Sequence, residues 1–253
     1  MLQLLILSTF TQAQTAPTAP STAPLPTPAS APAAARNLRV DRVAGYVEVD
    51  ATVVLRDAPW LELLACTPGS REHESILTVA AKPSEIHLAL LILGLEPGHP
   101  MSRADRPATA TSPAAETVVP PSGSLVRVSL VYESDGKSIE ISPSAWIRDR
   151  RKEAKPIDDL WVFAGSSMAT LDDGTRVYRA DHNGNVLSLV SFGDEVLARQ
   201  GTVTNQDDQE AFGCAEGAIP PVGTRVKIRL RPVKTQPTTR PSPATTAPAA
   251  PSR

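Results

Sequence analysis

Residues 71–75 read Arg-Glu-His-Glu-Ser and hold the densest set of chemically useful side chains in the sequence. Carboxylates, an imidazole, a guanidinium and a hydroxyl are groups that bind polar ligands or transfer protons. We therefore predict a ligand-binding site made of Arg71, Glu72, His73, Glu74 and Ser75. If the segment is a strand, its two glutamates lie on one face and its other three side chains on the opposite face.

Two other interpretations of this segment stay open. In the first, Glu72 and His73 join His87 in a metal site or a small enzymatic centre around His73, although the spacing is not that of an HExxH metalloprotease. In the second, the charged residues form only a hydrogen-bonded turn with ion pairs that locks one strand to its neighbour. A single histidine in an apolar stretch, such as His87, is usually a core residue with a satisfied hydrogen bond.

Enzyme motifs give little support for catalysis. The Ala-Gly-Ser-Ser stretch at 164–167 lacks the GxSxG pattern of a nucleophilic serine, and no aspartate or histidine stands at a recognised triad spacing. We assign no catalytic residue, and the cofactor is unknown. The sequence favours a ligand-binding, protein-binding or structural module over an enzyme.

Composition and charge argue against some classes of binding partner. The chain has 253 residues with a net charge of -2, which argues against binding to nucleic acid or to an anionic membrane surface. The two cysteines, Cys66 and Cys214, either pair or remain separate buried thiols, and neither belongs to a CxxC metal motif. No apolar run reaches the ~20 residues needed to span a membrane.

Both ends of the chain have a biased composition. Residues 1–14 contain a short apolar run that ends in small and polar residues, which predicts a signal peptide whose basic start is missing, as in a sequence clipped at its start. Residues 15–36 and 234–253 are rich in Pro, Ala and Thr and predict a disordered linker and tail. We therefore expect a periplasmic or secreted protein with a protein or cell-envelope partner.

The globular domain is predicted over residues 37–233, with a low-complexity insertion at 101–121. Short runs with period-2 alternation, separated by turn signals, predict strands within 40–55, 60–66, 76–79, 125–132, 138–141, 160–166, 177–181, 186–190 and 225–230. Asp135-Gly136 and residues 182–185 predict hairpin turns. The basic face of the last strand predicts an edge strand protected against aggregation.

One helix is predicted over residues 83–93. Pro83 suits its first turn, Gly94 suits its C-terminal cap, and its body is apolar almost all round, which predicts burial on most sides. The fold class is therefore mainly β, a sandwich or open barrel with one buried helix, and α+β is the alternative.

Four separated blocks resemble one family of bacterial proteins. They are residues 71–75, residues 82–84 with the helix end at 93–98, residues 161–166, and the Pro-Pro-Val-Gly-Thr stretch at 220–224. Their order and spacing resemble the YdjY-domain family over about residues 40–232, although the family usually has lysine where Arg71 stands. The resemblance implies an extracytoplasmic domain and carries over no reaction, cofactor or catalytic residue.

Overall fold

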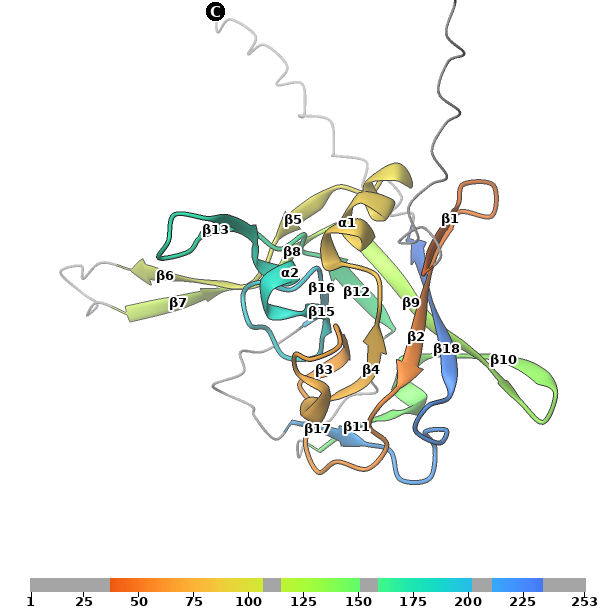
Figure 1. The fold of residues 1–253 in the computed structure, drawn as a ribbon. Coiled ribbons are helices and arrows are strands. Elements are labelled where there is room, and N and C mark those ends of the chain that lie inside the picture. The colour runs from red at the N-terminus through yellow and green to blue at the C-terminus, as the bar shows by residue number, and fades with distance from the viewer. Residues whose placement is uncertain (1–36, 107–114, 151–158, 202–210, 234–253) are drawn as a thin grey trace, which may run out of the picture. The chain divides into compact units, whose positions relative to one another are not determined.

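The computed structural model describes residues 37–106, 115–150, 159–201 and 211–233 (Figure 1). The predicted signal peptide at 1–14, the linker at 15–36 and the tail at 234–253 lie outside these described residues.

Eight strands pair side by side into a closed ring. In ring order they are β2 (Tyr46–Val53), β18 (Arg225–Pro232), β9 (Leu125–Ser134), β12 (Leu160–Phe163), β16 (Leu197–Arg199), β15 (Asn185–Ser188), β3 (Leu63–Cys66) and β4 (Ser75–Val79), and β4 pairs back with β2. The pairs β15–β16 and β3–β4 are parallel, and the other pairs in the ring are antiparallel. The prediction of a mainly β fold is confirmed, and the barrel is closed rather than open, so its strands pair on both sides.

Two further strands extend this ring. β1 (Leu38–Asp41) pairs with the first half of β2, whereas β4 pairs with the second half of β2. β10 (Lys137–Ile141) pairs with the second half of β9, whereas β12 pairs with the first half. The predicted hairpin turn between β9 and β10 is confirmed, because Asp135 and Gly136 both have positive φ angles, as a two-residue turn with matched twist requires.

Apolar side chains at alternate positions of the strands fill the core. Val47, Val49 and Ala51 of β2 lie opposite Leu230, Ile228 and Val226 of β18, and all six side chains are buried. The residues between them along each strand are mainly polar or charged and lie on the outer face. This alternation separates an apolar interior from a polar outer surface over β2, β18 and β9.

The predicted helix is confirmed as α1 (Pro83–Ile92), and Gly94 follows it with a positive φ angle. One face of α1 is buried, but Leu88, Leu91 and Ile92 are exposed. The expected burial on most sides is therefore wrong, because the barrel covers only one side of the helix. The apolar composition of the helix does not reveal how many of its sides have neighbours.

The remaining elements are short. They are η2 (Glu72–Glu74), β5 (Pro97–His99), β6 (Ser102–Arg106), β7 (Ala115–Val119), β8 (Ser122–Gly123), η3 (Pro143–Ala145), β11 (Ile147–Asp149), β13 (Met168–Thr170), β14 (Arg176–Tyr178), α2 (Arg179–Asn183) and β17 (Phe212–Cys214). β6 and β7 pair within the predicted low-complexity insertion. The predicted hairpin at 182–185 is wrong, because Gly184 ends α2 and β15 then pairs with β3 and β16.

Both cysteines are free thiols. Cys66 lies at the end of β3, Cys214 lies at the end of β17, and both are buried. Among the described helices, none is long and apolar enough to cross a membrane.

Candidate functional site

The predicted site segment is a helical turn rather than a strand. Residues 72–74 form the 3-10 helix η2, which directly precedes β4. Because a helical turn brings residues three apart together, Arg71 Nη1 lies 2.6 Å from Glu74 Oε1. The expected separation of Arg71 and Glu74 onto opposite faces of a strand is therefore wrong.

A second glutamate completes this cluster. Arg71 Nη1 also lies 3.6 Å from Glu62 Oε2, and the Glu62 backbone N–H donates to the Glu74 carbonyl oxygen. Only 12% of the Glu62 side chain and 10% of the Glu74 side chain are exposed. The Arg71 guanidinium packs over the ring of Phe192 at 4.2 Å. We call Glu62 and Glu74 the acid pair.

The acid pair shares one cation, and this shapes its protonation. Burial raises the pKa of Glu62 to about 7, and the hydrogen bond and charge of Glu74 act in the same direction, while Arg71 opposes them. Two buried carboxylates beside one guanidinium are neutral as a group only when one of them holds a proton. Glu62 is therefore the member of the acid pair that changes charge near neutral pH.

Glu62 was not among the site residues that the sequence predicted. It stands alone in the apolar run at 60–66, where it reads as one polar residue in a strand. A single glutamate among the apolar residues 61–66 was the available signal, because a carboxylate that is buried with them needs a partner.

The other three residues of the predicted site have different environments. Glu72 Oε1 accepts a hydrogen bond from the Gly69 N–H at 3.0 Å, and the buried Ser75 hydroxyl donates to the Leu77 carbonyl oxygen at 3.0 Å. His73 is 75% exposed, and its Nε2 lies 3.8 Å from Glu74 Oε2. Glu72 thus stabilises the local turn, Ser75 bonds within β4, and ligand binding by the whole segment stays a prediction.

His87 belongs to a separate cluster. Its Nδ1 lies 3.1 Å from the Gly165 carbonyl oxygen and 2.9 Å from the Tyr178 hydroxyl, and its ring meets Phe163 edge-on at 4.9 Å. Desolvation lowers the pKa of His87, although the hydrogen bond to Gly165 opposes this shift. These contacts are those of a half-buried structural histidine.

The structure does not bring the candidate metal ligands together. Within the described ranges, no group of three or more His, Cys, Asp and Glu side chains could hold a metal ion, and Glu72, His73 and His87 all lie in those ranges. The alternative of a metal site from these three residues therefore has no supporting geometry.

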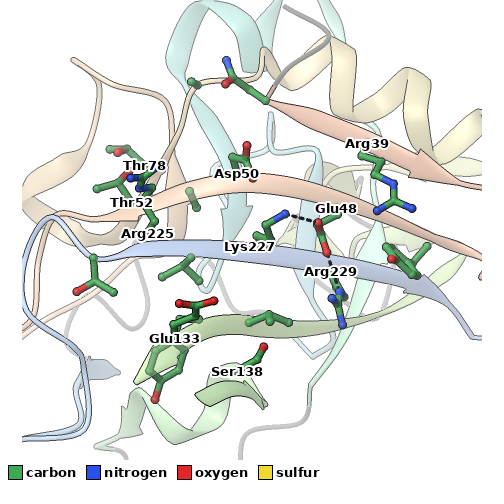
Figure 2. A pocket seen from close by; sticks show the side chains of 18 of the residues that line it. Arg39, Glu48, Asp50, Thr52, Thr78, Glu133, Ser138, Arg225, Lys227 and Arg229 are labelled. Atoms are coloured by element: carbon green, nitrogen blue, oxygen red, sulfur yellow. Dashed lines mark hydrogen bonds and ion pairs between the residues drawn. The ribbon is translucent and has the colours of Figure 1, made fainter. Parts of the chain in front are cut away.

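A groove lies elsewhere, on the polar outer face of β2, β18 and β9 (Figure 2). We call it the outer groove; its volume is about 1040 Å³. β2 contributes Glu48, Asp50 and Thr52, and β18 contributes Arg225, Lys227 and Arg229. No residue of the 71–75 segment lines it, but Pro68 from the same loop does.

One half of the outer groove is held by ion pairs. Glu48, only 5% exposed, accepts hydrogen bonds from Lys227 Nζ at 2.7 Å and from Arg229 Nε at 2.8 Å (Figure 2). Burial opposes ionisation of Glu48, but these two cations outweigh it and hold the pKa of Glu48 below its usual value. Arg229 also binds Glu140 on β10 at 2.8 Å. This half of the groove is therefore rigid and ionised.

Two basic side chains of the groove, Arg225 and Lys227, have hydrogen-bond donors that the described residues do not use. Arg225 is exposed and makes no hydrogen bond or ion pair with its side chain in the part of the chain that the structure describes. Figure 2 shows Arg225 at the same end as Thr52 and Thr78. Lys227 is 52% exposed and uses one of its three N–H donors on Glu48. These groups line the groove and can donate hydrogen bonds to a ligand.

The basic residues of the last strand have a different role from the one predicted. β18 pairs with β2 on one side and β9 on the other, so it is not an edge strand. Its cations instead pair across the outer face, with Glu48 on β2 and with Glu140 on β10. The prediction of an edge strand is therefore wrong. The partner strands β2 and β9 lie more than 90 residues away in the sequence, so the residues of β18 alone do not reveal them.

Comparison with known proteins identifies the family of the domain. A family model described as the YdjY domain matches residues 38–231, which cover the strands of the barrel except for the last residue of β18. Neither the curated proteins nor the solved structures contain a match. The chain belongs to the YdjY-domain family.

Proposed function

We propose that this domain is an extracytoplasmic binding module and that the outer groove is its ligand site. The observation that carries the proposal is a groove of about 1040 Å³ with a floor fixed by the buried Glu48 ion pairs. Small-molecule sites usually measure about 300–1,000 Å³ and use a few fixed polar groups for orientation. A rigid floor lowers the entropy lost when a ligand binds.

The charges of the groove indicate the ligand's chemistry. Arg225 and Lys227 offer donors to a carboxylate or phosphate, and the Thr52 hydroxyl lies on the neighbouring strand position, opposite Arg225. Asp50 and Glu133 also line the groove and favour hydroxyl or amino groups on the same ligand. The proposed ligand is a small polar molecule that carries both an anionic group and hydrogen-bond donors.

Amide NMR spectra of the full chain, recorded with acetate, inorganic phosphate, glycine and glucosamine 6-phosphate, test the proposal. We expect at least one probe to shift the amides of residues 225–229 and 50–52. We also expect Arg225→Ala and Lys227→Ala each to weaken that binding about tenfold, because a charge-assisted hydrogen bond contributes about 1.5–3 kcal/mol.

Arg176→Ala is the matched control, because Arg176 is exposed on β14 and does not line the groove. Its binding curve should equal that of the unmodified protein. The proposal is wrong if no probe moves the groove amides, or if binding survives unchanged when Arg225 and Lys227 are both replaced.

A further inference from the structure

The loop that carries Arg71 and Glu74 also reaches the outer groove. It joins β3 to β4 over residues 67–74, and Pro68 within it lines the groove. The loop is held internally by the Ser70 hydroxyl, which donates to the Thr67 carbonyl oxygen at 2.6 Å. The Thr67 N–H donates to the Gly184 carbonyl oxygen, which ties the start of the loop to the end of α2.

The second half of the loop is attached through the acid pair. Arg71 bridges Glu74, in the loop, and Glu62, just before β3, through one guanidinium nitrogen. The Glu62 N–H donates to the Glu74 carbonyl oxygen at 3.1 Å, so backbone and side chains connect the same two segments. Any force that separates these two carboxylates therefore acts on the loop.

The charge of the cluster depends on a single proton. With one proton on the acid pair, Arg71 balances the remaining carboxylate. Without that proton, a buried site holds two negative charges and one positive charge, and a buried charge without a partner is strongly destabilising.

We propose that a proton on Glu62, beside Glu74 and Arg71, latches the 67–74 loop and so sets the part of the outer groove that Pro68 lines. This inference rests on the groove being the ligand site. While the proton is present, the loop is held against the start of β3. When it leaves, repulsion between the carboxylates loosens the loop. The groove then changes near Thr78 and Thr52, because Cys66, directly before the loop, pairs with Thr78, and Thr78 pairs with Thr52.

The neighbouring charged groups fit this assignment. From the loop itself, Arg71 and His73 face the acid pair, while the Glu72 carboxylate is turned toward the Gly69 N–H. From the segment after β15, Phe192 stacks on Arg71, and the Glu195 carboxylate accepts from the N–H groups of residues 192–194. Glu195 is therefore engaged in its own turn. Since the pKa of Glu62 is about 7, the loop should loosen as the pH rises through neutrality.

Hydrogen exchange of the full chain at pH 6 and pH 8.5, corrected for the intrinsic exchange rate, tests the latch without any ligand. The reporters are the amides of Ser70 and Glu74, which donate within the loop. We expect corrected exchange at least fivefold faster at pH 8.5 in the unmodified protein, and equally slow exchange at both values in Glu62→Gln. The matched control is Glu72→Gln, which should keep the full pH dependence.

Equal corrected rates at both pH values in the unmodified protein overturn the latch, whether or not the variants fold. A pH dependence that persists in a folded Glu62→Gln variant also overturns it. Amide shifts of Thr52 and Thr78 must follow the same midpoint as the loop; if they do not move, the coupling to the groove is wrong. Failure of ligand binding alone leaves the exchange result intact and contradicts only the proposed function.

Discussion

Two buried glutamates on this barrel have opposite protonation behaviour. Glu48 lies under two cations, Lys227 and Arg229, and its pKa is lowered. Glu62 shares one cation with a second carboxylate, and its pKa is raised to about 7. Burial penalises ionisation at both sites, so the number of donors per carboxylate decides the direction of the shift.

The difference separates two roles for a buried charge. The Glu48 network stays ionised across the physiological range and makes a rigid floor. The acid pair is one cation short, so its charge depends on pH and its geometry is able to respond. The polar partners of a buried carboxylate, more than its depth, therefore determine whether it is a structural or a responsive group.

The largest expected effect concerns Glu62. Because its folded-state pKa lies above the ordinary value of 4.5, folding favours the protonated form, and stability falls as the pH rises from about 4.5 through about 7. Glu62→Gln should remove this loss, so that urea unfolding at pH 8.5 shows the variant more stable than the unmodified chain by up to about 3 kcal/mol. Near pH 4.5 the two proteins should unfold alike; a constant difference at both pH values would contradict the shared-proton interpretation.

A smaller effect is expected at Glu48, with the opposite sign. Glu48→Gln leaves Lys227 and Arg229 without their shared carboxylate, and we expect a loss of about 2 kcal/mol in the free energy of unfolding at pH 7. Glu133→Gln is the control, because Glu133 lines the same groove but is exposed, and its side chain makes no hydrogen bond or ion pair among the described residues. Its effect should stay within about 0.5 kcal/mol. Equal effects of the two variants would show that the Glu48 network does not stabilise the barrel.

The smallest effect is expected at His73. Its side chain is 75% exposed and lies 3.8 Å from Glu74, so His73→Ala should change the free energy of unfolding by less than about 0.5 kcal/mol. Thermal unfolding measures the change in stability, and elemental analysis of the purified protein measures its metal content. Stoichiometric metal that disappears in the variant would instead place His73 in a metal site and break the comparison between the two glutamates.

Part of the site was accessible from local sequence. Arg71 and Glu74 were both among the predicted site residues, because charged residues concentrated between two apolar runs stand out. A hydrogen-bonded turn with ion pairs was one of the open interpretations of the segment. The sequence did not show which of its residues pair, because a three-residue helical turn has no periodicity to detect. Glu62 and Phe192 were missed because they reach Arg71 from other segments of the barrel.

The sequence by itself determined the elements whose cause is local. The alternation in residues 46–53 and 225–230, the Asp135-Gly136 turn, and the helix between Pro83 and Gly94 follow from side-chain period and backbone preference. Only the tertiary structure decided which strands pair, that β4 closes the ring on β2, that β18 is central, and which carboxylates share a cation. Those outcomes depend on contacts between residues far apart in the chain, and a local pattern of side chains holds no information about a distant partner.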